Sequence, residues 1–341
     1  MTLRVLTGTA NPELAAAVAA ELFLEQPAPA VERFPDGELR PAVTGVRGAD
    51  VYLVQPTGPP VNDHLVELLL LLDACRRGGA ARVTVVAPYF GYARQDRRRK
   101  AGEAIGVRVA ADAITGAGAR RVVVVDPHTN ALEAICGVPT ESLTAVPLLA
   151  RALRDRTPPR TVVVAPDLGA AKLAEHYARL LSAPVAVVRK TRLTGTSVVA
   201  EEITGDVAGR PALIVDDMIS TGGTIEAAVD VLLAHGAVPE IAVAATHGLF
   251  VGEASRRLDR PETGTPLVTD TLAQGALPRD APSQDAPSQD ARSGDARSHE
   301  APPGDAEAGP RREVCSVAPL LADAVGRLHR DEPLDDLLTH T

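Results

Sequence analysis

Short runs of valine and isoleucine alternate along this chain with longer stretches rich in alanine and leucine. The runs Arg82–Ala87 and Arg121–Asp126 have the length of buried strands, while Val61–Arg77 has the length and apolar spacing of a helix. Alternation of this kind predicts parallel sheets covered by helices. Such sheets bind ligands at the carboxyl ends of their strands, so functional residues are expected where strands end.

The same pattern continues through the rest of the sequence. Further predicted strands are Arg4–Leu6, Asp50–Gln55, Thr161–Ala165, Val185–Val188, Ala212–Asp216 and Ile241–Thr246. Further predicted helices are Pro12–Glu25, Gly106–Ala117, Gly169–Leu181 and Thr224–Ala234. Aromatic residues make up 2% of the chain and Trp is absent, so the core must be built mainly from aliphatic side chains.

The length of 341 residues predicts two domains of ordinary size. VLTGTANPELAAAVAAEL in the first half and VVAPDLGAAKLAEHYARL in the second share a strand, a small-residue turn with a carboxylate, and an alanine-rich helix. This similarity favours a duplicated α/β domain, with a boundary at Pro147 that gives domains 1–146 and 147–341. The alternative is that any two strand–helix units resemble each other this much.

Charge and cysteine usage restrict the class of protein. A net charge of −9 argues against a general nucleic-acid binder, whose surface would carry a basic excess. Cys75, Cys136 and Cys315 lie far apart without metal-ligand spacing, which favours a reducing compartment. The N-terminus lacks the apolar core of a signal peptide, and the run Leu68–Leu72 is too short to cross a bilayer. We expect a cytoplasmic protein with no membrane or nucleic-acid partner.

Residues 281–305 form a five-residue repeat that begins APSQD, APSQD, ARSGD. The repeat has no apolar residue larger than alanine and cannot offset its ordering entropy by burial, which predicts a disordered insertion at about 279–311. A functional arm built from the repeat is the alternative. EVCSVAPLLADAVGRLH then predicts a strand and an amphipathic helix, so the second domain resumes, and this C-terminal helix can pack back on the first domain.

LIVDDMISTGGT, Leu213 to Thr224, is the strongest local signal for a binding site. An apolar strand ends in Asp216 and Asp217, and a glycine-rich turn then opens a helix. Free N–H groups at a helix start suit a phosphate, and glycines let the backbone approach it closely. Adjacent carboxylates suit ribose hydroxyls, directly or through Mg²⁺. The alternative is a purely structural motif, a capped helix after a buried strand, although burying two unpartnered acids would cost free energy.

Three further segments place charged groups near strand ends. PYFGYARQDRRRK, Pro88 to Lys100, is rich in arginine, whose guanidinium binds phosphate oxygens bidentately; a nucleic-acid patch is the alternative. VVVVDPHTN places Asp126 and His128 where they could hold a metal or contact phosphates. VRKTRLTGTSVV places Lys190 and Arg192 beyond a strand, which predicts a mobile cationic loop. On residue chemistry alone, FPDGE at 34–38 could be merely a hairpin turn. VVVVDPHTN and VRKTRLTGTSVV could also have only structural roles.

Together these segments resemble the ribose-phosphate pyrophosphokinase (phosphoribosyl pyrophosphate synthetase) family, from TGTANPELA to DDLL apart from the repeat. The motifs FPDGE, VNDHLVELLLLLDACRR, PYFGYARQDR, VDPH, DVAGR and DDMISTGGT occur in the family's order and at similar spacing. The resemblance implies two similar type I phosphoribosyltransferase-like domains, each a mainly parallel sheet flanked by helices. It implies transfer of pyrophosphate from Mg·ATP to O1 of ribose 5-phosphate, giving 5-phosphoribosyl 1-pyrophosphate and AMP for nucleotide biosynthesis.

The resemblance also implies roles for individual residues. For ATP binding they are Phe34, Asp36, Gly37, Glu38, Arg94, Gln95, Asp96, Arg97 and His128. For ribose 5-phosphate binding they are Arg192, Asp216, Asp217, Ser220, Thr221, Gly222, Gly223 and Thr224. Lys190 and Arg192 resemble the catalytic cations, and His128, Asp167 and Asp126 resemble residues at the Mg²⁺ site. The family forms homo-oligomers, commonly hexamers, in which Asp36–Glu38 would contribute to the ATP site of a neighbouring subunit.

Some positions depart from the family pattern. Ser220 stands where many members have Asp, and Gly137 stands where some carry a metal-associated Asp. Gly169 and Ala170 replace a more usual Gly-Gly pair. Two other functions stay open: an inactive regulatory homologue that binds nucleotides, and a phosphoribosyltransferase. The intact cations oppose the first alternative, and PYFGYARQDR, which phosphoribosyltransferases lack, opposes the second.

Overall fold

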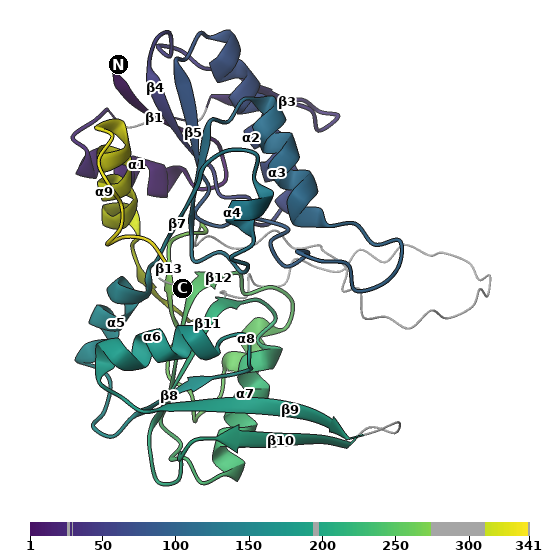
Figure 1. Cartoon of the computed structure of the whole chain (residues 1–341), viewed down its shortest axis with the longest axis vertical. Helices are drawn as coiled ribbons and strands as arrows, with labels where there is room; N and C mark the ends of the chain where they lie inside the picture. The colour runs from purple at the N-terminus through teal and green to yellow at the C-terminus, as the bar shows by residue number, and fades with distance from the viewer. Residues whose placement is uncertain (26–27, 29, 194–197, 274–310, 340–341) are drawn as a thin grey trace, which may run out of the picture.

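The computed structural model describes residues 1–25, 28, 30–193, 198–273 and 311–339. Positions 279–310 of the expected insertion lie outside the described residues. The described chain forms two α/β domains, one above the other in Figure 1. Within these ranges no helix is long and apolar enough to cross a membrane.

The first domain is built on a five-stranded parallel sheet with strand order β1-β4-β5-β6-β7. The strands are β1 (Leu3–Thr7), β4 (Asp50–Val54), β5 (Arg82–Val86), β6 (Arg121–Val125) and β7 (Thr140–Leu143). Side chains alternate between the two faces of each strand, as in β6. Val122 and Val124 pack with the helices on one face, and Val123 and Val125 pack on the other. Both faces are therefore buried.

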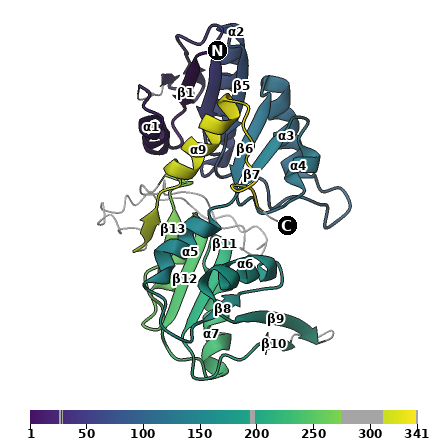
Figure 2. The same ribbon diagram turned by 60° about the vertical axis from the view of Figure 1, so that its left-hand side comes forward.

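Helices cover both faces of this sheet (Figure 2). Helices α2 (Val61–Arg77) and α3 (Gly106–Ala117) lie on one face, and the short α4 (Leu132–Ile135) packs beside α3. On the other face lie α1 (Pro12–Glu21) and the C-terminal helix α9 (Ala318–His329).

The second domain contains a seven-stranded sheet with strand order β10-β9-β8-β11-β12-β13-β14. The strands are β8 (Val162–Ala165), β9 (Val185–Leu193), β10 (Val198–Thr204), β11 (Ala212–Ile219), β12 (Ile241–Gly248), β13 (Leu267–Thr269) and β14 (Glu313–Cys315). All pairs are parallel except β9 with β10. Helices α5 (Val146–Arg154) and α6 (Ala171–Leu181) cover one face, and α7 (Gly223–Ala234) and α8 (Ala254–Leu258) cover the other.

The two domains share one strand order, which confirms the predicted fold class. The sequence β1-β4-β5-β6-β7 in the first sheet corresponds to β8-β11-β12-β13-β14 in the second. In each domain the part of the sequence that connects the first of these strands to the second contains an antiparallel hairpin. The first hairpin, β2 (Val31–Arg33) with β3 (Leu39–Pro41), forms a sheet of its own, whereas β9–β10 extends the second sheet. In Figure 1 the β9–β10 hairpin projects from the second domain.

The structure corrects two element predictions. The first helix ends at Glu21 rather than Glu25, because Phe23 adopts a φ of 55° that cannot continue a helix. Lys190 and Arg192 were expected in a loop beyond a strand that ended at Val188. They lie within β9, which continues to Leu193 because its backbone pairs with β10 as far as Val198.

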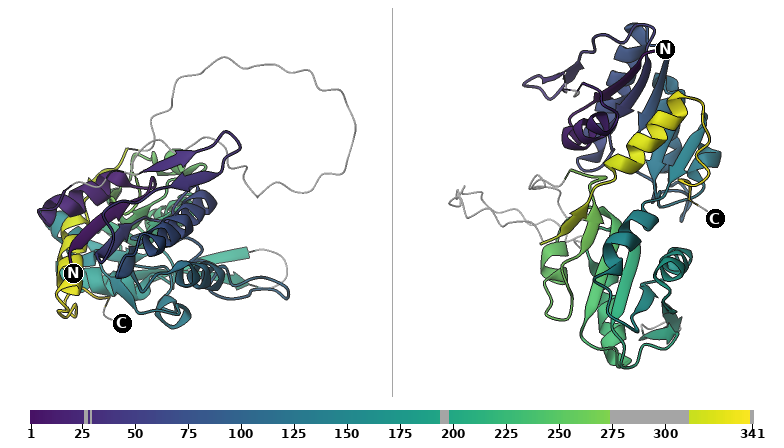
Figure 3. Two further views of the ribbon diagram at one scale, coloured as in Figure 1. Left: turned by 90° about the horizontal axis from the view of Figure 1, so that it is seen from above. Right: turned by 90° about the vertical axis from the view of Figure 1, so that its left-hand side faces the viewer.

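The C-terminal segment joins both domains. Strand β14 pairs with β13 in the second sheet, and α9 then packs against α1 of the first domain, as the right-hand view of Figure 3 shows. A strand and helix were predicted for this part of the sequence, and the structure confirms both. The predicted boundary at Pro147 falls at the start of α5 and stays a prediction.

A buried ion cluster anchors the end of α9. The Asp50 carboxylate has no exposed surface and accepts hydrogen bonds from Arg82 through Nε at 2.5 Å and Nη2 at 2.7 Å. The His329 Nδ1 atom lies 2.7 Å from the same carboxylate. Burial alone would raise the pKa of Asp50, but Arg82 and His329 outweigh it and hold that pKa below its ordinary value.

Candidate active site

The two adjacent carboxylates of the acidic motif lie near the carboxyl end of β11, at the seam between the domains. The side chain of Asp216 accepts a 2.9 Å hydrogen bond from the Asp217 backbone N–H. Burial raises the pKa of Asp216 well above its ordinary value, and the neighbouring charges of Asp217 and Asp167 raise it further. A cation or a hydroxyl-rich ligand beside Asp216 would lower the free-energy cost of burying its charged form.

His128 of the first domain contacts Asp217 of the second. Its Nδ1 atom lies 2.7 Å from Asp217 Oδ2. The hydrogen bond raises the pKa of His128 above its ordinary value, against the opposing effect of burial. Burial would raise the pKa of Asp217, but the bond and charge of His128 leave it lowered. This hydrogen-bonded pair therefore links the two domains at the site.

The glycine-rich turn after β11 leads directly into α7. Gly222 precedes the helix with a φ of 77°, a left-handed conformation that glycine adopts without strain. Helix α7 has no side-chain cap, so the first backbone N–H groups of the helix can receive an anion. Arg94 of the first domain donates a long, 3.5 Å hydrogen bond to Ser220 Oγ at the start of this turn.

Asp126, expected at a metal site, is held by structural hydrogen bonds. Its Oδ2 atom accepts from the Ala145 N–H at 3.0 Å and from the Thr246 hydroxyl at 2.7 Å, and the residue is 6% exposed. Thr246 belongs to β12 of the second domain, so this carboxylate also bridges the seam. The contact indicates a role in positioning the segment that carries His128, and metal binding by Asp126 stays a prediction.

Asp167 follows β8 and shapes the turn before α6. Its Oδ1 atom accepts from the N–H groups of Gly169 at 2.8 Å and Ala170 at 3.2 Å. In the part of the chain that the structure describes, no three His, Cys, Asp or Glu side chains form a ready-made metal cage. Magnesium at phosphate-transfer sites is commonly held by one or two carboxylates together with substrate phosphates.

The expected ATP-binding residues divide into two groups in space. Gln95, Asp96 and Arg97 follow Arg94 at the carboxyl end of β5, and Arg97 pairs with Asp96 at 3.0 Å. Phe34 to Glu38 instead form the tip of the β2–β3 hairpin, where Gly37 has a φ of 95°. The hairpin is fastened to α2 through an ion pair of Arg33 with Asp63 at 3.1 Å. Among the described residues, this ion pair ties the hairpin to α2 rather than to the seam.

The proposed catalytic cations lie on β9 of the second domain. Backbone pairing places Lys190 opposite Glu201 and Arg192 opposite Val199. Alternation along a strand puts residues 190 and 192 on one face and Arg189 on the other. The side chains of Lys190 and Arg192 lie outside the described part of the structure.

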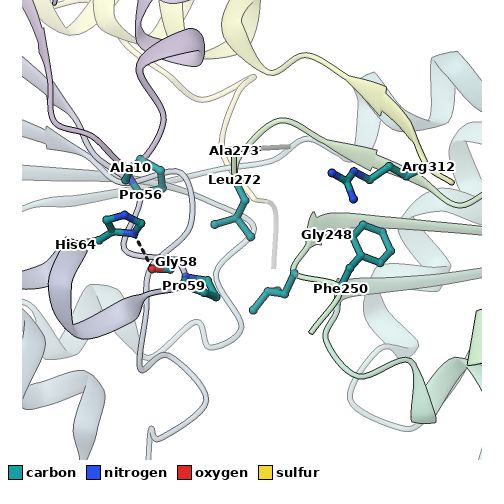
Figure 4. A pocket seen from close by; sticks show the side chains of 11 residues that line it. Ala10, Pro56, Gly58, Pro59, His64, Gly248, Phe250, Leu272, Ala273 and Arg312 are labelled. Carbon is teal, nitrogen blue, oxygen red and sulfur yellow. Dashed lines mark hydrogen bonds between the residues drawn. The ribbon is translucent and has the colours of Figure 1, made fainter. Parts of the chain in front are cut away.

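A cavity opens beside the site, between the domains (Figure 4). Its lining residues come from both domains and are Ala10, Pro56, Gly58, Pro59, His64, Gly248, Leu249, Phe250, Leu272, Ala273 and Arg312. His64 Nδ1 lies 2.9 Å from the Gly58 carbonyl oxygen and thereby holds the turn before α2.

Sequence reasoning missed several residues at the seam. Thr246 and His247 both bond to Asp126, and the Arg257 guanidinium donates to the Thr221 carbonyl oxygen at 3.4 Å. A β-carbon added at Gly223 would lie 2.8 Å from Arg257 Nη1, so a larger residue there would require the end of the Arg257 side chain to shift. The adjacent Thr and His of ATHGLF were the available signal, but they end a buried strand without a motif of their own.

The two domains share one fold, and the second has an acidic strand end followed by a glycine-rich helix start. These features define a protein with two phosphoribosyltransferase-like domains. Profiles of known families agree with both halves. The N-terminal domain of ribose phosphate pyrophosphokinase matches residues 3–118, and the phosphoribosyl transferase domain matches residues 135–265.

Whole-chain comparisons are more specific. The ribose-phosphate pyrophosphokinase of Gloeobacter violaceus is 39% identical over 98% of this chain and 92% of its own length. That of Caldanaerobacter subterraneus is 37% identical over 99% and 98%. The crystal structure of phosphoribosylpyrophosphate synthetase from Mycobacterium smegmatis superposes with a TM-score of 0.80 at 33% identity, covering 97% of this chain and 100% of that one. The chain belongs to the ribose-phosphate pyrophosphokinase family.

Proposed function

We propose that this protein transfers the pyrophosphoryl group of Mg·ATP to O1 of ribose 5-phosphate, producing 5-phosphoribosyl 1-pyrophosphate and AMP. One observation carries the proposal beyond family membership. His128 and Arg94 of the first domain meet Asp217 and Ser220 of the second at a single seam. A donor bound by the first domain and an acceptor bound by the second would therefore face each other.

The second domain supplies the acceptor site. Asp216 and Asp217 would bind the ribose hydroxyls, and the turn from Ser220 to Thr224 would receive the 5-phosphate at the start of α7. The uncapped helix start and the left-handed Gly222 support this assignment. Ser220 stands where many members of the family have a carboxylate. Its hydroxyl suits a phosphate oxygen.

The first domain supplies the donor site. Arg94, Gln95, Asp96, Arg97 and His128 would bind the nucleotide and its phosphates, because they cluster at the carboxyl ends of β5 and β6. The exposed β2–β3 hairpin, with Phe34 and Asp36–Glu38 at its tip, would reach the ATP site of a neighbouring subunit in a homo-oligomer, by family resemblance a hexamer. Its attachment to α2, rather than to the seam, supports that arrangement.

The residues at the seam fit a magnesium ion. Asp216 and Asp217 offer adjacent carboxylate oxygens, and Asp167 is near enough to influence the charge of Asp216. His128 contacts Asp217 and would flank the metal and the nucleotide phosphates. Bound Mg²⁺ would neutralise phosphate oxygens and fix their orientation.

The reaction is an in-line displacement at the β-phosphorus of ATP. The O1 hydroxyl oxygen forms the new bond and its proton is released to solvent, while the bond from the β-phosphorus to the bridging oxygen breaks and AMP leaves with that oxygen. Lys190 and Arg192, on one face of β9, would neutralise the charge that develops on the bridge. Positioning and charge stabilisation would provide most of the rate enhancement.

The test is to incubate the protein with Mg·ATP and ribose 5-phosphate and to separate AMP from ADP. AMP formed in step with phosphoribosyl pyrophosphate supports the proposal, whereas ADP would indicate an ordinary kinase. Neither product, with ATP still bound, would favour the regulatory homologue. The described cysteines are free thiols, which supports a cytoplasmic location for this activity.

Lys190→Ala should lower turnover about 100-fold, the scale of a lost transition-state contact. Arg189→Ala is the matched control, because it removes an exposed cation from the opposite face of the same strand. Retained turnover in Lys190→Ala, or equal losses in both variants, would refute the assigned role.

A further inference from the structure

His247, on β12, is a buried histidine that the proposed reaction does not use. It is 1% exposed, and both of its ring nitrogens have partners. Nε2 lies 3.2 Å from the Asp126 carbonyl oxygen, and Nδ1 lies 2.9 Å from the Thr271 hydroxyl. A carbonyl oxygen can only accept, so Nε2 carries the proton and Nδ1 accepts from Thr271. Burial lowers the pKa of His247, which keeps the ring neutral.

The His247 ring contacts two segments of the first domain. It packs edge-on against Tyr89, with ring centroids 5.1 Å apart and an interplanar angle of 79°. Tyr89 begins the segment that leads to Arg94. The Asp126 carbonyl, which accepts the hydrogen bond, lies two residues before His128. One side chain therefore touches both strand-end segments that would bind the nucleotide.

His247 is also fixed within the second domain. Strand β12 pairs with β11 in a register that sets His247 opposite Met218, the residue after Asp217. Thr271, its second partner, lies against Thr269, whose hydroxyl donates to the Thr246 carbonyl at 2.7 Å. These threonines are fully buried, so the ring is held on the side of the acceptor site by buried hydrogen bonds.

We propose that His247 is a positioning residue that holds the donor-binding segments of the first domain in register with the acceptor-binding strand end of the second. It has this role only if the two substrates bind as proposed above. Each substrate would bind chiefly to one domain, so loss of the ring should disturb their mutual alignment more than the binding of either one. A displacement of about 1 Å between reacting groups can lower turnover about 100-fold.

The test compares His247→Leu with His247→Gln. Leucine removes both hydrogen bonds, whereas the glutamine amide can still donate to the Asp126 carbonyl. In His247→Leu we expect kcat for AMP formation to fall about 10- to 100-fold. Glutamine should recover a substantial part of that loss. Binding of ribose 5-phosphate and of α,β-methylene-ATP, each measured alone by calorimetry, should change no more than about threefold, because each site lies mainly within one domain.

His329→Gln is the matched control, since it also replaces a histidine that contacts an aspartate distant in the sequence, but one in the Asp50 cluster. It should lower the thermal midpoint and leave kcat unchanged. The inference is overturned if wild-type enzyme turns over and His247→Leu does so equally well. It is also overturned if both binding constants weaken as much as kcat, or if glutamine performs no better than leucine. Absence of AMP from the wild type would overturn the proposed function and this inference together.

Discussion

Replacing Arg82 with methionine would remove the guanidinium that holds the buried carboxylate of Asp50. Asp50 has no exposed surface, and Arg82 is 27% exposed. In the variant, the His329 ring at 2.7 Å would be the remaining side-chain partner among the described contacts of this carboxylate. Methionine has a similar apolar stem, so the change removes charge and hydrogen bonds with little change in packing.

The expected loss of stability follows from this burial. Breaking one side of a buried ion pair costs about 3–5 kcal/mol, and the Asp50 carboxylate would lose both hydrogen bonds from Arg82 while keeping its contact with His329. At about 2–4 °C per kcal/mol for a domain of this size, the first thermal transition should fall by about 6–20 °C. Unfolding of a two-domain chain need not be two-state, so the first transition is the quantity to compare.

The assay is a thermal melt of Arg82→Met beside Arg77→Met. Arg77 pairs with Asp73 at 2.6 Å on the surface of α2 and is 75% exposed, so solvent screens the pair and its loss should barely change the melting temperature. Activity below the transition should be retained in both variants, because neither residue lies at the seam. Equal melting temperatures for the two variants would refute the reasoning.

The pH dependence supplies a second check on the same cluster. A carboxyl group whose pKa is lowered in the folded state stabilises the fold above its ordinary value of 3.8. That contribution is lost as the pH falls through the lowered value. The stability difference between wild type and Arg82→Met should therefore be largest near neutral pH and shrink in acid. A difference that grows in acid would contradict this assignment.

Two further predictions concern the seam. Thr246→Val should cost about 1–3 kcal/mol in a urea titration, because it removes a donor from the buried Asp126 carboxylate; an unchanged midpoint would show that the 2.7 Å contact contributes nothing. The pKa of His128, followed by NMR, should lie above the ordinary histidine value in the wild type and fall in Asp217→Asn. The stability from this pair is present in full below the ordinary pKa and is lost as the pH rises through the raised one. Equal pKa values in the two proteins would contradict the pairing.

Local sequence pattern located most of the buried strands and long helices, but it missed shorter elements such as β7, α5 and β13. Helices α2 and α3 begin and end where their apolar periodicity predicted, since Gly78 and Gly118 follow their last residues. The acidic motif before α7 was also located, because its glycines and carboxylates are contiguous in the sequence, although β11 continues past the predicted end at Asp216 to Ile219. Local pattern did not predict the full length of β9, because pairing with β10 extends this strand through polar residues.

The contacts between domains could not be read from the sequence. Asp126 and His247 are 121 residues apart, and Asp50 and His329 are 279 residues apart. Asp50, His247 and His329 each stand alone in an ordinary strand or at a helix end, so no spacing marks them. Asp126 was marked by its spacing to His128, but that motif did not indicate which residue of the second domain it would meet. Their roles arise only when the two sheets meet, which is a property of tertiary packing rather than of local propensity.

The pairing of β13 with β14 has a consequence for how this chain can vary in length. Strand β14 pairs with β13 after a gap of forty-three positions in the sequence, and Asp270 accepts a 2.7 Å hydrogen bond from the Val317 N–H. Leu272, Ala273 and Arg312, on either side of residues 274–310, line the same cavity (Figure 4). For a flexible connection, each doubling of length costs only about 0.6 kcal/mol in closure entropy. This junction is therefore a natural graft point, where evolution or an engineer could exchange one connecting segment for another, or for a reporter domain, while the catalytic seam keeps its geometry.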